Sequence, residues 1–169
     1  MNLGVDAAME AGVTITGAFD DASASYFGGL VITDNRERKI LKRIGIEEHY
    51  PVLIYVPPKK AYTAKSNVEK MKLIANEVKA LHKMAYLGDY WSAMTLNGIV
   101  YSTILGYDAE IAIEALAAGA LAAGLSGTGP AVAAVVPGGE VEEVKEAWRK
   151  YGGTLIETCI NSEKSHILR

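Results

Sequence analysis

The hydrophobic positions of the chain change period several times, and each change predicts a new element. Apolar residues recur at helical spacing over residues 3–11, which predicts a short helix near the start. Two short runs rich in β-branched residues, Leu30–Thr33 and Lys39–Ile44, predict strands. The turn residues Asp34 and Asn35 lie between these runs and predict that the two strands form a hairpin.

A second block of elements starts with the strongly apolar run Val52–Val56, which two prolines stop. That run predicts a strand buried on both faces. Helical spacing and capping residues then predict the remaining elements: a helix from Val68 past Ala85, helices at Tyr90–Ser102 and Ala109–Ala122, a strand at Ala131–Val136, a helix at Glu140–Tyr151 and a strand at Thr154–Ile160. This order predicts an α+β fold in which an antiparallel sheet carries helices on one face.

The predicted helix at Ala109–Ala122 is narrow because small residues crowd its second half. The alanines concerned are Ala117, Ala118, Ala120, Ala122 and, just beyond the helix, Ala123. Small side chains allow a neighbouring element to come close. We therefore expect another element to pack tightly against this helix.

Composition narrows the class of protein. Half of the 169 residues are hydrophobic and 22% are charged, as in a globular domain, and the net charge of −3 does not favour a nucleic-acid surface. Cys159 is the only cysteine, which excludes an internal disulfide, and its apolar neighbours favour a core thiol. His49, His82 and His166 show no metal-ligand spacing, so we assign no metal-binding residue.

The apolar stretch at residues 109–136 is interrupted by Glu, Gly and Pro, and no basic segment opens the chain. We therefore expect a cytoplasmic protein without a membrane span or signal peptide.

The segment Gly17–Gly29 is where we expect chemistry. Its adjacent carboxylates, Asp20 and Asp21, are flanked by Ala, Phe and Tyr instead of the polar residues usual on a solvated loop. Partial desolvation raises a carboxyl pKa toward the value that a general base needs. The alternative is structural, since either Asp can cap a short helical turn at Ala22–Tyr26. Both interpretations stay open, because one Asp can cap while the other faces a substrate.

A glycine-rich turn, Gly124–Ala131, is expected to join the narrow helix to the next strand. It has neither the lysine nor the strand-to-helix order of a Walker A loop, and Val132 stands where a dinucleotide fingerprint needs Gly or Ala. Side-chain-free backbone lets a ligand approach closely, and two hydroxyls add polar contacts. The residues concerned are Gly124, Ser126, Gly127, Thr128 and Gly129. A tight connection between two elements is the alternative.

Together the two motifs resemble those of the GHMP small-molecule kinases, a superfamily that includes galacto-, homoserine, mevalonate and phosphomevalonate kinases. The glycine-rich stretch is similar to the third motif of the family. Asp21 lies seven residues before the Gly28-Gly29 pair, as the catalytic Asp of the family does. Within the superfamily, the acidic segment most resembles the archaeal-type shikimate kinases. The resemblance implies a C-terminal ferredoxin-like α/β sandwich at residues 48–169 and, at residues 1–47, part of an N-terminal domain with the catalytic loop.

The resemblance also implies a function. The intact enzyme would transfer the γ-phosphoryl group of ATP, with Mg²⁺, to a hydroxyl of shikimate, a step toward the aromatic amino acids. Asp21 would orient that hydroxyl and take its proton, and Asp20 would substitute for it or raise its pKa. The other expected contacts are Ser23 and Ser25 to the substrate or the Asp pair, Lys65 (with Lys59 and Lys60 as unranked alternatives) to the substrate carboxylate, and residues 124–129 to the phosphates.

One motif of the superfamily is missing from the sequence. Nothing here resembles Pro-x-x-x-Gly-Leu-Gly-Ser-Ser-Ala, the loop that wraps the ATP phosphates and that precedes the acidic segment in the family. We therefore expect a kinase without its N-terminal part, which would supply most ligands of ATP and Mg²⁺. Such a chain would be inactive alone and would pair with the missing segment or form a homodimer through the hairpin region. Alternatives are a homoserine- or mevalonate-type kinase and a non-catalytic α+β ligand-binding module.

Overall fold

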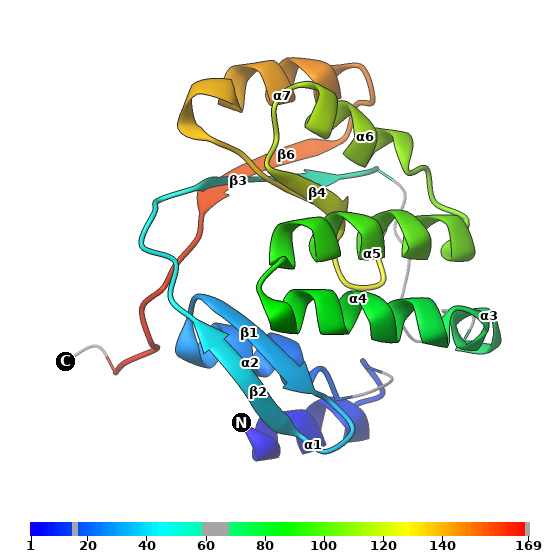
Figure 1. The fold of residues 1–169 in the computed structure, drawn as a ribbon, viewed down its shortest axis with the longest axis vertical. Helices are drawn as coiled ribbons and strands as arrows, with labels where there is room; N and C mark the ends of the chain where they lie inside the picture. The colour runs from blue at the N-terminus through cyan, green and yellow to red at the C-terminus, as the bar shows by residue number, and fades with distance from the viewer. Residues whose placement is uncertain (15–16, 59–67, 168–169) are drawn as a thin grey trace. The chain divides into compact units, whose positions relative to one another are not determined.

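The chain folds into two compact units (Figure 1). The residues that the computed structural model describes are 1–14, 17–58 and 68–167. Unit 1 combines residues 1–49 with the chain end, residues 160–169, and unit 2 is residues 50–159. The assignment of residues 1–47 and 48–169 to two domains of the family, which the resemblance implies, remains a prediction.

Unit 1 is built from two helices and a hairpin. Its elements are α1 (Asn2–Glu10), α2 (Phe19–Phe27), β1 (Leu30–Asp34) and β2 (Lys39–Ile44). The two strands pair antiparallel, which confirms the predicted hairpin, and α1 confirms the predicted first helix. Val5 of α1, Phe19 of α2 and Ile32 of β1 are buried and supply the apolar interior of this unit.

Helix α2 starts earlier than the sequence predicts. It begins at Phe19, and its N-cap is Ala18, whose backbone is left-handed with φ 50°. Asp20 and Asp21 therefore lie inside the first turn, and no side chain caps the helix. The prediction of an Asp cap is wrong, because the left-handed Ala18 turns the main chain into the helix before the acidic pair is reached.

Unit 2 contains a four-stranded antiparallel sheet of order β4-β5-β3-β6. Its strands are β3 (Pro51–Val56), β4 (Ala122–Leu125), β5 (Val132–Val135) and β6 (Thr154–Cys159). The helices found in its described residues are α3 (Val68–Leu73), α4 (Ala75–Leu87), α5 (Tyr90–Leu105), α6 (Glu110–Ala117) and α7 (Val141–Arg149), and a short 3₁₀ turn, Gly138–Glu140, precedes α7. The α+β class predicted from the sequence is therefore confirmed.

One face of this sheet carries the hydrophobic core. Leu53 and Tyr55 of β3 and Val132 of β5 point to this side and are buried. Helix α6 adds alanines, and α7 adds the fully buried Trp148. The indole Nε1 of Trp148 donates to the carbonyl of Ile111 at 2.7 Å, which satisfies its one polar atom. Helices α6 and α7 thus cover this face (Figure 1).

Helix α5 packs against β4 on the other side. Ala123 faces the core, so the next residue along the strand, Gly124, faces away from it. There the Gly124 backbone lies directly against Gly98 of α5, and a Cβ added at Gly98 would come within 2.6 Å of the Leu125 nitrogen. Thr95 Oγ1 accepts a hydrogen bond from the Ala123 amide at 3.2 Å. The expectation of helices on one face is therefore wrong for α5, behind which α4 forms a further layer (Figure 1).

Strand β4 is the element of unit 2 that the sequence does not predict. Helix α6 ends at Ala117, well before the expected end at Ala122, and Gly119 then takes a left-handed backbone with φ 100°. The alanines beyond it join the sheet, where Ala122 pairs with Val135 of β5. The tight packing expected from these small residues is present, but it belongs to a strand and not to a helix.

Two predictions about burial are also wrong. Val52 and Ile54 are only half-buried and Val56 is exposed. The reason is that α5 covers β4, an edge strand that β5 separates from β3. Cys159 is exposed and is not a core thiol, since it ends β6, an edge strand exposed along its whole length.

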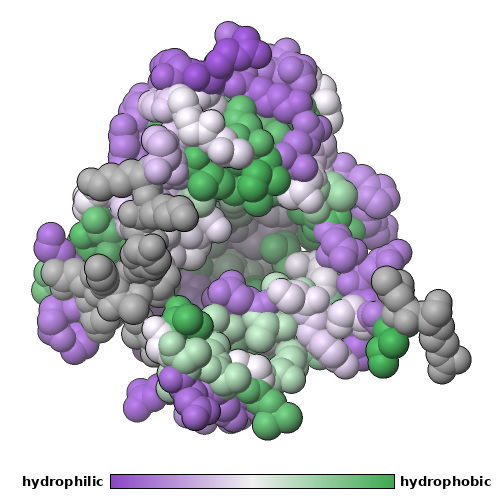
Figure 2. Space-filling model, turned by 180° about the vertical axis from the view of Figure 1, so that it is seen from behind, coloured by the Kyte–Doolittle hydropathy of each residue, from purple (hydrophilic) through white to green (hydrophobic). Residues whose placement is uncertain are grey.

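On the face shown in Figure 2, apolar patches lie among polar side chains. On the hairpin, Leu41 is 42% exposed, while Val31 and Ile44 are half-buried. Among the helices in the described ranges, none combines the length and the apolar character needed to cross a bilayer.

The contact between Gly98 and β4 predicts that Gly98→Ala destabilises unit 2 by about 1 to 3 kcal/mol, because the new Cβ overlaps main-chain atoms that cannot move aside. Gly4 of α1 is a matched control, since a Cβ there meets nothing within 4 Å. Gly4→Ala should leave stability unchanged or raise it by up to about 1 kcal/mol. Urea unfolding of both variants measures the difference, and equal midpoints would show that α5 does not pack on the β4 backbone.

Candidate active site

The acidic pair lies in the first turn of α2, and Asp20 is tied to the hairpin. Asp20 Oδ1 accepts a hydrogen bond from Asn35 Nδ2 at 2.8 Å. Asn35 Oδ1 accepts one from Thr33 Oγ1, also at 2.8 Å. These three side chains connect the start of the helix to the turn between β1 and β2. The sequence marks Asn35 only as a turn residue, so its contact with Asp20 is new information from the structure.

Asp21 is placed differently from its neighbour. The residue is exposed, and within the described part of the chain its carboxyl has no hydrogen bond or ion pair. Partial burial of the carboxyl and, second, the negative charge of Asp20 raise the pKa of Asp21. A helix N-terminus acts in the opposite direction, and it does not prevail here. The raised pKa agrees with the sequence expectation of a partly desolvated carboxylate in this pair.

The two serines of α2 point in different directions. Ser23 is fully buried, and its Oγ donates to the carbonyl of Phe19 at 2.6 Å. This bond is the local alternative to a substrate contact. Ser25 is exposed and lies four residues after Asp21, on the same face of the helix. The structure therefore brings Asp21 and Ser25 together on an open face and turns Ser23 inward.

The Gly28-Gly29 pair ends α2 and starts β1. Both glycines have a left-handed backbone, with φ 66° and 70°. A Cβ at Gly28 would lie 2.9 Å from the Asn161 carbonyl oxygen, and a Cβ at Gly29 would contact the Ile44 carbonyl. The Gly29 amide also donates to the Asn161 carbonyl at 2.8 Å. The pair therefore lets the helix, the hairpin and the chain end meet at one point.

The glycine-rich turn of unit 2 joins β4 to β5, and not a helix to a strand as the sequence predicts. Gly124 is buried within β4, whereas Ser126 and Gly127 are exposed at the tip. The turn is closed by the Gly129 amide, which donates to the Ser126 carbonyl at 2.9 Å. Gly127 has a left-handed backbone, φ 58°, with open space where a Cβ would stand. Thr128 is half-buried.

The remaining sequence-predicted site residues, Lys65 with Lys59 and Lys60, lie outside the described residues. The acidic helix belongs to unit 1 and the glycine-rich turn to unit 2. Each half of the candidate site is therefore described within its own unit.

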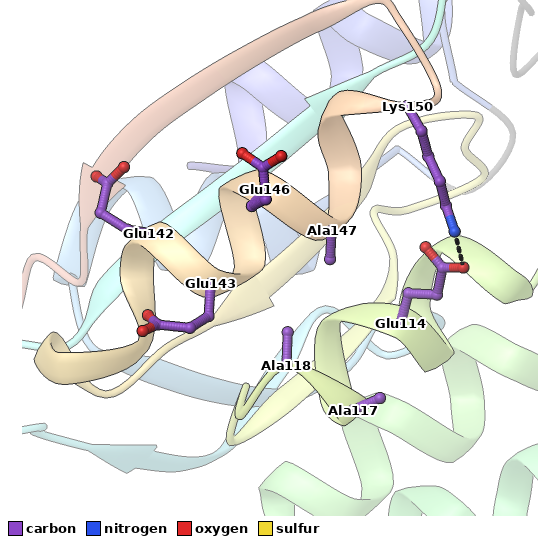
Figure 3. A pocket seen from close by; sticks show the side chains of 8 residues that line it. All are labelled: Glu114, Ala117, Ala118, Glu142, Glu143, Glu146, Ala147 and Lys150. Atoms are coloured by element: carbon purple, nitrogen blue, oxygen red, sulfur yellow. Dashed lines mark hydrogen bonds and ion pairs between the residues drawn. The ribbon is translucent and has the colours of Figure 1, made fainter.

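A groove of about 760 Å³ lies between α6 and α7 (Figure 3). Its charged lining consists of Glu114, Glu142, Glu143 and Glu146 against one cation, Lys150, whose Nζ lies 2.5 Å from Glu114 Oε1. That hydrogen bond lowers the pKa of Glu114. Excess negative charge repels a triphosphate, so this groove is not a nucleotide site. Within the described residues, no group of three His, Cys, Asp or Glu side chains could hold a metal ion.

Comparison with known proteins identifies the class to which this arrangement belongs. Residues 72–154 match the family model described as GHMP kinases C terminal. Unit 2 therefore contains a GHMP kinase C-terminal domain, and the resemblance inferred from the two sequence motifs is confirmed.

Curated relatives from archaea narrow the comparison. A shikimate kinase of Methanobrevibacter smithii is 47% identical over 162 residues, which is 96% of this chain and 56% of the relative. A shikimate kinase of Methanosarcina mazei is 50% identical over 164 residues, again 96% of this chain and 55% of the relative. The chain thus spans little more than half the length of these relatives.

Solved structures support the fold. The mevalonate kinase of L. major, crystallised with R-mevalonate, has a TM-score of 0.65 at 19% identity. The matched part is 90% of this chain and 54% of the mevalonate kinase chain. A homoserine kinase from Cytophaga hutchinsonii has a TM-score of 0.54 at 18% identity and covers 83% of this chain and 51% of its own. At such low identity these likenesses show the shared fold alone.

The raised pKa of Asp21 predicts a stability change with a definite sign. A folded-state pKa above the ordinary value of 3.8 means that the ionised carboxylate destabilises the folded chain at neutral pH. Asp21→Asn should therefore increase stability at pH 7, by less than about 1 kcal/mol because the residue is exposed to screening water. The gain should fade as the pH falls through the folded-state pKa of Asp21. It should be absent below the unfolded-state pKa, where the carboxyl is protonated in both states. Thermal unfolding at pH 7 and pH 3 measures it.

Asp6→Asn is the control for that experiment. Asp6 pairs with Arg38 at 2.7 Å, so its removal should leave stability at pH 7 unchanged or lower it. A loss of stability at pH 7 in Asp21→Asn would contradict the electrostatic account of this site.

Proposed function

We propose that this chain forms part of an ATP-dependent shikimate kinase and contributes its catalytic carboxylate. The observation that carries the proposal is the identity of 47–50% to archaeal shikimate kinases over 96% of the chain, a span that includes both the acidic helix and the glycine-rich turn. The exposed position of Asp21 on α2 supports the same proposal.

In the proposed reaction, the Asp21 carboxylate orients the acceptor hydroxyl of shikimate. The hydroxyl oxygen bonds to the γ-phosphorus, the bond from that phosphorus to the bridging oxygen of ADP breaks, and the hydroxyl proton passes to Asp21. A raised pKa makes a carboxylate a better proton acceptor, and Asp21 has this property. Asp21 has no competing partner among the described residues, so its oxygens are available to a substrate.

The neighbouring residues take supporting roles in this proposal. Asp20 is held by Asn35, so it acts through its charge on Asp21 and does not meet the substrate first. Ser25 shares the exposed face with Asp21 and is the serine that we assign to the substrate. Ser23 acts indirectly, because its hydroxyl is occupied inside the helix. Lys65 keeps its proposed role at the shikimate carboxylate.

The phosphates of ATP are proposed to approach the turn at residues 124–129. Its exposed tip offers the hydroxyl of Ser126 and a backbone without a side chain at Gly127, and the half-buried Thr128 follows. This fits a phosphate only in part, because the turn contains no cation. Mg²⁺, bound with ATP as the family implies, and basic groups outside this turn must neutralise the remaining charge.

Two parts of the interpretation remain predictions. One is that the chain alone lacks activity, and the other is that two copies associate through the hairpin, where Leu41 is exposed. The alternative acceptors, homoserine and mevalonate, have weaker support, since solved kinases for them are only 18–19% identical to this chain.

A fusion protein tests the proposed function. It joins this chain to the part of the Methanobrevibacter smithii relative that the chain does not match, in the order of that relative. We expect the fusion protein to phosphorylate shikimate with ATP and Mg²⁺ and to leave homoserine and mevalonate unchanged. Asp21→Asn should lower kcat at least about a hundredfold through loss of a positioned base. A coupled ADP-release assay measures both.

Asp20→Asn is the matched comparison, and its kcat should fall less than that of Asp21→Asn. The reverse order would exchange the roles of the two carboxylates. An Asp21→Asn variant within threefold of the parent, with unchanged folding, would refute the assignment of Asp21.

The turn makes a separate prediction. Gly129→Val should raise the KM for ATP in the fusion protein or lower its melting temperature, because a Cβ there would lie 2.6 Å from Leu125 Cδ1 and 2.9 Å from Tyr107 Cε2. Gly127→Ala, which meets open space, should cost only the strain of a left-handed backbone, about 1 kcal/mol. Unchanged kinetics and melting temperature in Gly129→Val would show that the turn is a simple connection.

A further inference from the structure

A chain of three polar side chains crosses from the hairpin to the acidic helix. Thr33 Oγ1 donates to Asn35 Oδ1 at 2.8 Å, and Asn35 Nδ2 donates to Asp20 Oδ1 at 2.8 Å. Thr33 and Asn35 are half-buried, whereas Asp20 is exposed. The link joins residues 15 positions apart in the sequence and lies wholly within unit 1.

The Asp20 carboxylate, which only accepts hydrogen bonds, turns the NH₂ group of Asn35 toward itself, and the Thr33 hydroxyl donates to the amide oxygen on the other side. A hydroxyl donor facing Asn35 needs the carbonyl oxygen of the amide on its side, which leaves the NH₂ group for Asp20. With the amide reversed, its oxygen would face a carboxylate oxygen, and two acceptors repel each other. The hydroxyl of Thr33 does not touch Asp20, but its bond to Asn35 Oδ1 stabilises the amide in the orientation that donates to Asp20.

Four charged side chains at this turn have partners other than Asp20, and Arg36 is exposed without an ion pair among the described residues. Arg38 pairs with Asp6 of α1 at 2.7 Å, and Lys39 lies 3.6 Å from Glu37. Asp34 accepts the amide of Glu37 at 3.0 Å within the turn. Asp20 is thus held from this turn by a neutral amide and not by a cation.

The Asn35 amide that holds Asp20 carries no charge, and this affects the pKa of Asp21. A lysine or arginine at position 35 would also hold Asp20, but its positive charge would favour the ionised form of Asp21 and make it a weaker base. A neutral amide fixes the direction of the Asp20 carboxylate and leaves its negative charge in place. Asp20 then stays turned toward the hairpin, and the Asp21 carboxyl stays open.

We propose that Thr33 and Asn35 are positioning residues for Asp21, acting through Asp20. This inference rests on the proposed function, because it assigns the network to the transfer step and not to folding alone. Neither residue touches the substrate in this assignment. Their loss should therefore change kcat and leave substrate binding intact.

The kinetic test uses the fusion protein with substitutions that keep the branched shape of each side chain. Thr33→Val removes the hydroxyl, and Asn35→Leu removes the NH₂ donor without adding a charge. Each should lower kcat about tenfold, the effect of one lost hydrogen bond to a charged group, with the KM values for shikimate and ATP changed less than about twofold. Thr33→Ser restores the hydroxyl and should restore kcat. Arg36→Ala, an exposed substitution in the same turn, should leave kcat unchanged.

The double variant Thr33→Val/Asn35→Ala separates a connected network from two independent effects. In the proposed network, the effect of Thr33 on Asp20 passes through the Asn35 amide, so the double variant should be no slower than Asn35→Ala alone. Independent losses that multiply would overturn the inference. A rise in KM with unchanged kcat would also overturn it, since that result places the residues in substrate binding.

A structural measurement on this chain alone separates the failure of the network from the failure of the proposed function. The Nδ2 protons of Asn35 give two resonances in an ¹⁵N correlation spectrum. Thr33→Val and Asp20→Ala should each shift them, and Arg36→Ala should not. If neither Thr33→Val nor Asp20→Ala shifts these resonances, the proposed network is refuted, even if the fusion protein is an active kinase. An inactive fusion protein with the shifts present would overturn the proposed function, and with it the role assigned to the network. An active fusion protein with unchanged kcat in both variants would overturn the inference alone.

Discussion

The Gly28-Gly29 pair is the constraint on which the candidate site depends. Its left-handed backbone lets α2, the β1–β2 hairpin and residues 161–163 meet at a point where any Cβ would strike main-chain atoms. Ser162 strengthens the same junction, since its Oγ accepts from the Ile46 amide at 3.1 Å and donates to the Ile46 carbonyl at 2.8 Å. The direction of α2 is thereby fixed, and Asp21, seven residues earlier, stands about two helical turns away at the other end.

The opposite end of α2 gives its two carboxylates different environments. Asp20 is held by a neutral amide from the hairpin, whereas Asp21 is left open with a raised pKa. A carboxylate pair in one helical turn costs stability, and this cost is consistent with the proposed role of Asp21 as a proton acceptor. Unit 2 makes a complementary use of glycine: Gly98 and Gly124 bring α5 onto the β4 backbone, and the turn after β4 presents the exposed tip at residues 126–127.

The sequence predicted the elements whose periodicity is local and missed those that depend on distant partners. The hairpin and the α+β class followed from alternation and helical spacing. Strand β4 did not, because alanines favour a helix in isolation and only pairing with β5 makes them a strand. The acidic motif and its glycine pair could be read from the sequence. The apolar residues that flank the motif also indicated that the pKa of one carboxylate is raised. The contact of Asn35 with Asp20 and the inward direction of Ser23 were not, since both depend on how side chains meet in the folded chain.

The central claim is that Asp21 is an open carboxylate with a raised pKa, suited to accept a proton, while a hydrogen bond from Asn35 holds the neighbouring Asp20. Carbon-detected NMR titration of the aspartate carboxyls in this chain tests it most directly, with the Asp21 signal assigned by its disappearance in Asp21→Asn. The account predicts that Asp21 titrates above the ordinary aspartate value of 3.8 and that Asp20→Asn moves this titration downward, because the second cause of the shift is the charge of Asp20. An Asp21 carboxyl that titrates at or below 3.8 would contradict the account.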